Sequence, residues 1–461
     1  MTGQTALGLA TGESMMGAQK YVNPLLGKVL AIGGLTLVLL MPLGQVGSLV
    51  NERAGMRELA SQKVADRWGG AQIVSAPILS IPVETEYEER GRKLRSITWR
   101  RMLAASVSIR GEIKPQLRHV GIYTVPVYET PLKISGVFSP EALAPLLTVQ
   151  PLQTVRWSDA RLFIPIGEVR GIREMSAAQW GDQPLRLQPA SYDGISGVEA
   201  PVDVSDLRNG EQREFLLEYT LAGSSNLRAL PLAGVTSVTL RSTWPHPSFD
   251  GAFLPTYTLD AKGFDARWQV LELNRGFPQA WDDTAVPREA IEIAAFGVSL
   301  FQPVDTYHRN ERAIKYALLF IAITFMSVFL WEQVSGTRIH AMQYLFVGLA
   351  LCVFYLLLLA LSEHVPFGYA YLIAALAQAG LVGVYLGSGL KSGRIGVIVA
   401  SALGAVYGLL YLLILSEQYA LLLGAVFVFA VLAALMLATR RTDWYLLGSR
   451  AKQAVAGEEY T

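Results

Sequence analysis

The chain has 461 residues, of which 51% are hydrophobic and only 17% are charged, and its mean hydropathy is +0.33. An average soluble domain has about 25% charged residues, so this composition excludes a chain that is soluble throughout. The formal net charge of +1 offers no basic face for DNA or RNA. Cys352 is the single cysteine, which excludes an intramolecular disulfide and a cysteine-rich zinc site.

The charged residues are concentrated in one stretch of the chain. Residues 51–312 contain 29 Lys or Arg and 31 Asp or Glu, out of 39 and 38 in the whole chain. That density is typical of soluble protein, whereas the remainder has long uncharged runs. The sequence therefore predicts a membrane part and a water-soluble part in one chain.

Six apolar runs are long enough to cross a bilayer, which takes about 20 helical residues. The first of these runs is longer than the apolar core of a signal peptide, which has about 7–15 residues, so we expect it to be an uncleaved membrane anchor. The predicted spans are residues 28–50, 313–333, 341–361, 367–387, 395–415 and 419–438. Residues 1–27 and 439–461 are then terminal tails, and residues 51–312 form an inserted domain.

Lys and Arg in short loops resist translocation and so indicate orientation. The loops Ser362–Pro366 and Ser416–Gln418 contain none. The opposite side receives all of the basic residues in the short loops and tails: Lys20, Lys28, Arg338, Lys391, Arg394, Arg440, Arg441, Arg450 and Lys452. This predicts cytoplasmic termini and an extracytoplasmic 51–312 domain.

The inserted domain begins with a helical pattern and continues with strand patterns. Met56, Leu59, Val64 and Trp68 recur at helical spacing, and the Gly-Gly pair at 69–70 ends the pattern, which predicts a stalk helix. Short β-branched and aromatic runs separated by Pro and Gly follow, which predicts an antiparallel, sandwich-like β domain. The predicted fold class is thus a six-span α-helical membrane protein with a large β-rich extracytoplasmic domain.

Two of the predicted outer loops share a Leu-Ser-Glu motif. The segment Tyr355–Glu363 aligns with Leu409–Glu417, which suggests duplicated hairpins of the kind found in some transporters. The structural alternative is that Ser and Glu cap the start of the following helix, and we favour it because neither carboxylate lies deep in an apolar run. The candidate functional polar cluster at this face is Ser362, Glu363, His364, Ser416 and Glu417.

No catalytic, cofactor-binding or metal site is predicted. Ser362, Glu363 and His364 include the residue types of a hydrolytic triad, but adjacent residues at a helix end point in different directions. The five histidines never fall at metal-ligand spacing, and no phosphate-binding or nucleophile motif occurs. Small residues one turn apart, Gly383 with Gly387 and Gly404 with Gly408, predict close helix packing instead.

One peptide in the inserted domain is unusual enough to be a candidate motif: Trp244, Pro245, His246 and Pro247. Prolines on both sides of His246 favour an extended backbone, and aromatic residues flank the segment. A buried structural corner is the favoured interpretation, because aromatic side chains mainly supply core area, and a binding site is the alternative.

These residues resemble those of a known family. The segment Ser242–Phe249, the start of the second span from Arg312 to Met326, the run Tyr355–His364 and the peptide Thr442–Tyr445 are similar to the CreD family of bacterial inner-membrane proteins. The resemblance implies a multi-pass protein of the bacterial inner membrane that is associated with cell-envelope integrity and controlled by a two-component system. It supplies no catalytic or cofactor-binding residues.

The sequence and the resemblance together predict a non-enzymatic protein without a cofactor. Its expected partners are the lipid bilayer and envelope components or other inner-membrane proteins, and not nucleic acid. The alternative is a membrane transporter or lipid-handling module built on the duplicated hairpins. A transporter needs polar groups near mid-membrane, where the spans offer only Gln378 and a few Ser or Thr, so we favour the first interpretation.

Overall fold

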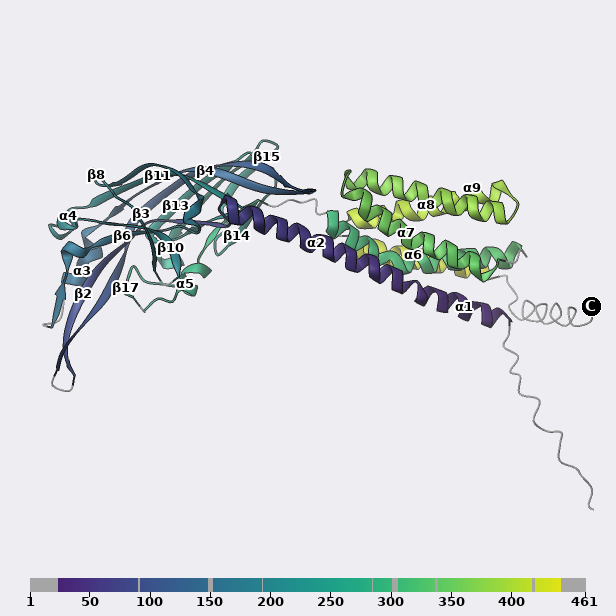
Figure 1. Cartoon of the computed structure of the whole chain (residues 1–461), viewed down its shortest axis with the longest axis horizontal. Coiled ribbons are helices and arrows are strands. Elements are labelled where there is room, and N and C mark those ends of the chain that lie inside the picture. Colours follow the sequence, from purple (N-terminus) through teal and green to yellow (C-terminus); the bar gives the residue numbers. More distant parts are fainter. Residues whose placement is uncertain are drawn as a thin grey trace, which may run out of the picture. The chain divides into compact units, whose positions relative to one another are not determined.

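The computed structural model describes residues 24–89, 92–147, 152–192, 194–283, 285–300, 306–335, 339–416 and 419–440. The chain divides into two units (Figure 1). Met1–Arg53 and Thr306–Thr461 make up a helical unit, and Ala54–Asp305 make up a β-rich unit.

The helical unit is built from seven helices in the part of the chain that is described. Their bounds are α1 Pro24–Val38, α2 Leu40–Trp68, α6 Thr306–Ser335, α7 Ala341–Ser362, α8 Phe367–Gly389, α9 Gly393–Leu415 and α10 Ala420–Thr439. Five helical stretches in the described residues have the length and hydropathy to cross a membrane, namely Gly27–Trp68, Thr306–Gln333, α7, α8 and α9. The last predicted span, 419–438, coincides with α10, which contains a shorter apolar stretch at Leu421–Ala433. The described residues therefore define a membrane protein with several spanning helices.

Aromatic rings and glycines pack the helical unit. The Phe354 ring lies 5.5 Å from Tyr371 and 4.4 Å from Tyr407, which joins α7, α8 and α9. A Cβ added at Gly383 would lie 2.8 Å from the Gly396 carbonyl oxygen, so α8 and α9 approach as closely as their backbones allow. The packing predicted at Gly383 and Gly387 is confirmed.

The packing predicted at Gly404 and Gly408 is wrong. A Cβ at either position would meet no atom within 4 Å, because both glycines of α9 face open space. Sequence spacing identifies a small-residue face but not whether another helix covers it.

The β-rich unit contains strands of two sheets and three short helices. The strands are β1 Gln72–Ser75, β2 Ile78–Glu89, β3 Arg92–Val120, β4 Tyr123–Phe138, β5 Gln153–Val155, β6 Arg161–Pro165, β7 Ile172–Trp180, β8 Gln183–Pro184, β9 Gln188–Tyr192, β10 Ile195–Pro201, β11 Arg213–Ser224, β12 Asn226–Leu230, β13 Ala233–Ser242, β14 Pro247–Gly251, β15 Thr256–Asp260, β16 Gly263–Leu271, β17 Ala280–Asp282 and β18 Phe296–Leu300. The helices are α3 Ala144–Leu147, α4 Ser205–Arg208 and α5 Arg288–Ile293. A large β-rich domain is thus present.

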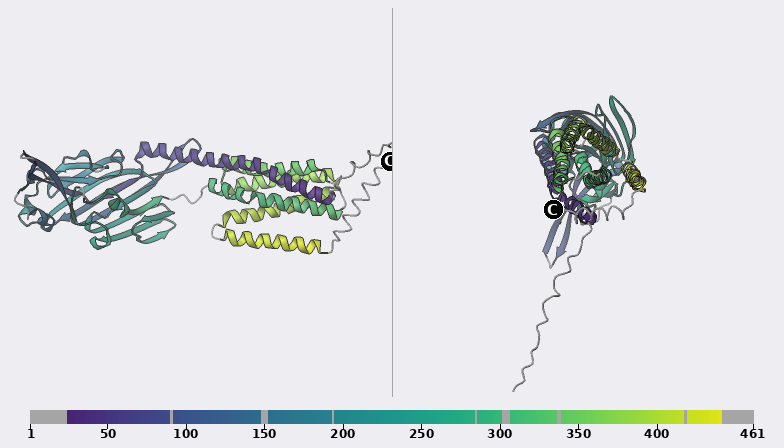
Figure 2. Two further views of the ribbon diagram at one scale, coloured as in Figure 1. Left: turned by 90° about the horizontal axis from the view of Figure 1, so that it is seen from below. Right: turned by 90° about the vertical axis from the view of Figure 1, so that its right-hand side faces the viewer.

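The strands form a 4-stranded sheet, in the order β1-β12-β18-β14, and a 14-stranded sheet. Figure 2 shows the strands of this unit from two further sides. Their pairing is antiparallel except for β1 with β12 and β13 with β3. The long strand β3 pairs with β2, β4, β13 and β17, so it is the centre of the large sheet. In β11 buried Phe215, Leu217, Tyr219 and Leu221 alternate with more exposed residues, as expected for a strand with one face on the core.

A glycine pair connects the helix α2 to the first strand of the β-rich unit. Gly69 and Gly70 have φ values of +129° and +49°, which favour glycine, and a Cβ at Gly69 would lie 2.5 Å from the Ala222 carbonyl oxygen. The Trp68 ring before them lies 4.6 Å from the guanidinium carbons of both Arg118 and Arg173. The end of α2 is therefore fixed to the strands by cation–π contacts and by a tight backbone approach.

Candidate functional site

Ser362 and Glu363 lie at the end of α7 and do not cap the next helix. Ser362 is the last residue of α7, Glu363 is its C-cap, and the N-cap of α8 is Pro366, which has no side-chain capping bond. The capping interpretation is therefore wrong for these two residues. It failed because α8 begins later than the Leu-Ser-Glu motif suggests.

Both side chains instead contact the beginning of α6. The Asn310 Nδ2 group donates to the Ser362 Oγ at 3.0 Å, and the Tyr307 hydroxyl donates to a Glu363 carboxylate oxygen at 3.1 Å. Arg53 of α2 lies 3.8 Å from the same carboxylate. We call Arg53, Tyr307, Asn310, Ser362 and Glu363 the α6–α7 polar cluster; it joins three helices at one end of the helical unit.

The second copy of the motif contacts the same helix through its backbone. Arg312 donates to the carbonyl oxygens of Leu413 and Ser416 at 3.1 and 3.3 Å, which satisfies carbonyls that α9 leaves free at its end. Glu417 lies outside the described residues. The sequence analysis did not predict that α6 supplies the partners of both motifs.

The arrangement has no hydrolytic geometry. The Ser362 hydroxyl donates to the Leu359 carbonyl oxygen at 3.0 Å, and its neighbour Asn310 is an amide that cannot act as a general base. The His364 side chain is exposed, while Glu363 faces Tyr307. No group of three or more potential metal-ligating residues occurs among the residues that the structure describes.

A second polar cluster, which the sequence analysis missed, lies at the opposite end of α6. Glu332 is 5% exposed; its carboxylate forms an ion pair with Lys28 of α1 and accepts from the Ile339 amide at 3.1 Å and the Tyr344 hydroxyl at 3.0 Å. We call Lys28, Glu332, Ile339 and Tyr344 the Glu332 cluster. The sequence did contain a signal for this cluster. Glu332 is an acidic residue at the end of an apolar run, and Lys28 is predicted to lie on the same side of the membrane.

The Trp244–Pro247 motif forms a corner between the two sheets. It follows β13 of the large sheet, and Pro247 begins β14 of the small sheet, where it pairs with Leu300. The Trp244 indole donates to the His246 carbonyl oxygen at 3.1 Å, and the His246 side chain is exposed. Trp244 is partly buried against the core, whereas Pro245 and His246 are exposed, so the corner is only partly buried and its role stays a prediction.

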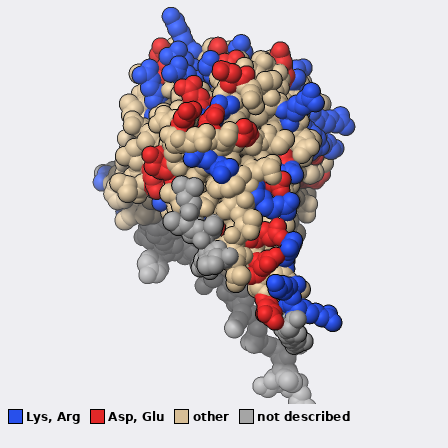
Figure 3. Space-filling model, turned by 90° about the vertical axis from the view of Figure 1, so that its left-hand side faces the viewer, with Lys and Arg blue, Asp and Glu red and all other residues tan. Residues whose placement is uncertain are grey.

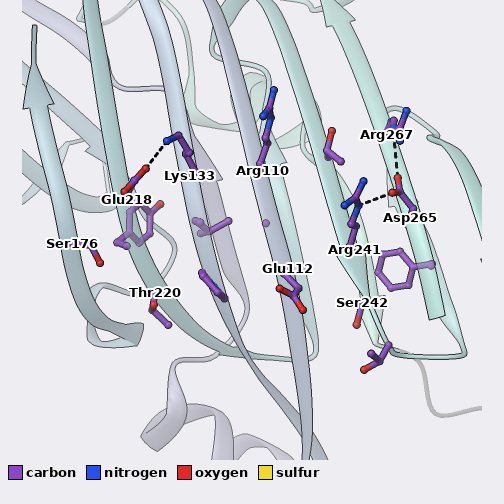
Figure 4. A pocket seen from close by; sticks show the side chains of 17 residues that line it. Arg110, Glu112, Lys133, Ser176, Glu218, Thr220, Arg241, Ser242, Asp265 and Arg267 are labelled. Atoms are coloured by element: carbon purple, nitrogen blue, oxygen red, sulfur yellow. Dashed lines mark hydrogen bonds and ion pairs between the residues drawn. The ribbon is translucent and has the colours of Figure 1, made fainter. Parts of the chain in front are cut away.

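A polar groove of about 1070 Å³ crosses the large sheet from β16 to β7 (Figure 4). Cross-strand register places Arg110 of β3 between Thr239 of β13 and Lys133 of β4. The hydroxyl and charged residues lining it include Ser176, Thr220, Thr239, Ser242, Arg110, Glu112, Lys133, Glu218, Arg241, Asp265 and Arg267. Buried Tyr219 also lines the groove, and burial raises the pKa of its hydroxyl, which therefore stays protonated at physiological pH.

Most of the charges in this groove are paired with each other. Lys133 contacts Glu218 at 2.7 Å, and Asp265 contacts Arg241 at 2.6 Å and Arg267 at 3.2 Å. Arg110 is exposed and forms no ion pair within the described part of the chain. Exposed Glu112, two residues along the same strand, also lines the groove and forms no ion pair among the described residues. The groove thus leaves one guanidinium and one carboxylate unpaired, and the guanidinium can bind an anionic group from solution.

The surface charges of the β-rich unit are of both signs. Lys and Arg are interspersed with Asp and Glu across the face shown in Figure 3. This mixture agrees with the near-neutral charge of residues 51–312.

A bundle of apolar helices interrupted by a large β-rich unit defines a polytopic membrane protein with one inserted extramembrane domain. The chain belongs to the CreD family, described as "Inner membrane protein CreD", whose profile matches residues 24–445. It is 33% identical over 434 residues to "Inner membrane protein CreD" of Escherichia coli (strain K12), an alignment that covers 92% of this chain and 94% of that protein. The family resemblance seen in the sequence is therefore confirmed, and the chain is a member of an inner-membrane protein family.

Solved structures add no functional information. A crystal structure of an M1 zinc metallopeptidase from Deinococcus radiodurans is 10% identical to this chain, with a TM-score of 0.19 over 36% of this chain and 38% of the peptidase. A TM-score this low does not indicate a shared fold.

Proposed function

We propose that this chain is a non-catalytic inner-membrane protein that contributes to cell-envelope integrity. In this proposal it has six spans, both termini in the cytoplasm, and the sandwich-like β unit in the periplasm. Family membership supports the location, and the Lys and Arg asymmetry between the short loops supports the orientation.

The polar residues of the spans favour this proposal over transport. The buried polar residues in the described helices of the helical unit are Asn310, Thr324, Glu332, Ser362 and Gln378. Only Thr324 and Gln378 lie away from the helix ends, and the Thr324 hydroxyl donates to the Phe320 carbonyl oxygen within its own helix. A transport site needs several converging polar groups at that depth.

The observation that carries the proposal is the polar groove on the exposed face of the large sheet. An unpaired Arg110 among hydroxyl groups is suited to an acidic or phosphate-bearing component of the envelope. An open groove of this size suits an extended ligand that is held by several weak polar contacts. The β-rich unit would thus bind the envelope while the helices anchor it.

Substitution of the unpaired arginine tests this role. Arg110→Gln should abolish complementation of an envelope-stress phenotype at matched protein abundance, because the amide is polar but shorter and carries no charge. Lys93→Gln is the matched control, since Lys93 is exposed and has no described ion-pair partner. It lies on the same strand, about 56 Å away along the chain at roughly 3.3 Å per residue. Full complementation by Arg110→Gln would contradict the groove's role.

Reporter insertions test the orientation separately. A reporter inserted after Gly210, an exposed turn residue of the β-rich unit, should be active only as a periplasmic protein, and one inserted after Lys391 only as a cytoplasmic protein. The reverse pair of results would overturn the proposed topology.

A further inference from the structure

Two connected grooves run along the outer side of the α8–α9 hairpin. The larger has a volume of about 850 Å³ and reaches the end where Pro366 and Tyr411 lie. The smaller has a volume of about 470 Å³ and reaches Lys391 and Ser392 in the turn between the helices. They share Gly380, Val397 and Ala400, so together they follow the hairpin from one end to the other.

Missing side chains create these grooves. A Cβ added at Gly380, Gly404 or Gly408 would meet nothing within 4 Å, although α8 and α9 touch backbone to backbone at Gly383 and Gly396. The helices therefore pack along one line and leave a furrow beside it. Exposed Leu372, Leu376 and Val397, which are 55%, 66% and 67% exposed, form its apolar walls.

The inner wall of the larger groove is closed by an aromatic residue. Tyr407 lines the groove and is only 4% exposed, and its ring packs 4.4 Å from Phe354 of α7, so its side chain points into the bundle. An occupant of this groove therefore meets mainly apolar surface.

Two cations stand at the turn end of the smaller groove. Lys391 lines this groove, Arg394 lies three residues later, and both are exposed and form no ion pair in the described part of the chain. Lys391 has a φ of 50°, a left-handed conformation that favours glycine. The turn thus has a lysine at a position where the backbone conformation favours glycine.

We propose that the α8–α9 groove binds an anionic phospholipid, with its headgroup at Lys391 and Arg394 and an acyl chain along the small-residue furrow. The helix length fits this occupant. Half of a bilayer core is about 15 Å thick, which corresponds to about ten helical residues. Counted from the two cations, that distance ends near Gly380 on α8 and Gly404 on α9, where the two grooves meet.

The charge at the turn distinguishes this occupant from a second copy of the chain. A hairpin of another copy would also fill an apolar furrow, but a copy inserted with the same orientation brings its own Lys391 and Arg394 to this end. Two further cations do not neutralise the turn, whereas a phosphate headgroup does. Each cation near an anionic headgroup contributes a factor of about five in affinity.

Filling the furrow tests the acyl-chain half of the proposal. Native mass spectrometry of the detergent-solubilised full chain, titrated with phosphatidylglycerol, should show one preferred site, and Gly380→Leu should weaken it at least about tenfold, the effect of about 1.4 kcal/mol. Gly424→Leu in α10 is the matched control, because a Cβ there also meets nothing within 4 Å and the residue lines neither groove. Gly404→Leu on the other helix provides a second filling variant should Gly380→Leu fail to fold.

Neutralising the turn tests the headgroup half. Wild type should prefer phosphatidylglycerol over phosphatidylcholine by about 25-fold at this site, and Lys391→Gly with Arg394→Gln should remove the preference while thermal stability stays unchanged or rises. Binding by the filling variants as tight as in wild type, or equal weakening by Gly424→Leu, would overturn the proposal. So would a dimeric wild type that Gly380→Leu converts to a monomer, because the furrow would then hold a second copy.

Discussion

The two ends of helix α6 are joined to α7 by different physical means. At one end the Glu332 carboxylate is buried; it forms an ion pair with Lys28 and accepts hydrogen bonds from the Ile339 amide and the Tyr344 hydroxyl. At the other end, buried Asn310 forms a neutral bond to Ser362, and the carboxylate of Glu363 is 11% exposed. Removing the partner of a buried charge costs more free energy than removing a neutral hydrogen bond. We therefore expect substitutions at the Glu332 end to destabilise the protein more than those at the Asn310 end.

The largest effect should come from Glu332→Ala. This change leaves the Lys28 ammonium and two further donors without their acceptor, and breaking such a pair in a mostly buried site costs about 3 kcal/mol. The free energy of unfolding in a defined detergent, or the abundance in membranes, should fall accordingly.

Two further variants sharpen the result at this end. Glu332→Gln keeps one acceptor oxygen for either the Ile339 amide or the Tyr344 hydroxyl, which contact different oxygens of Glu332, so it should lose less than the alanine variant. Lys28→Met combined with Glu332→Leu removes both charges and should recover much of the loss. No recovery in the double variant would show that the ion pair itself, and not the desolvated charge, determines the stability.

Asn310→Ala should have an intermediate effect of about 2 kcal/mol. The side chain is 1% exposed and joins α6 to α7, and its removal leaves a small cavity and takes away the hydrogen bond that the Ser362 oxygen accepts. The same unfolding measurement checks it. An effect larger than that of Glu332→Ala would reverse the ranking of the two ends.

Glu363→Gln should have the smallest effect, no more than about 1 kcal/mol. The amide still accepts from the Tyr307 hydroxyl and loses only the attraction to Arg53, which lies 3.8 Å away and is 39% exposed. Envelope-stress complementation at matched abundance should be retained. Loss of complementation by this isosteric variant would favour a proton-coupled transporter and contradict the non-catalytic proposal.

Length, hydropathy and charge predicted several spanning helices and a β-rich domain, because burial in lipid and in a sheet core leaves strong periodic signals. The pairing of Lys28 with Glu332 was not predictable in this way. Its residues are separated by most of the chain, and only the folded bundle brings them together. The Leu-Ser-Glu motif was located correctly but interpreted wrongly, because motif spacing does not reveal where α8 begins.

The groove of the β-rich unit shows a similar limit. Arg110 is one of many charged residues in its stretch, and nothing in its neighbours along the chain marks it as unpaired. Only the cross-strand register, which places Thr239 and Lys133 beside it, identifies the position as a candidate contact for an anion.

The central position of β3 has a consequence for how the β-rich unit is synthesised. β3 ends at Val120, but its parallel partner β13 begins only at Ala233. At synthesis rates of about 5–20 residues per second, the intervening chain takes on the order of ten seconds to emerge. During that time one long edge of β3 has no partner, and exposed strand edges promote aggregation. Folding of this unit is therefore expected to be slow.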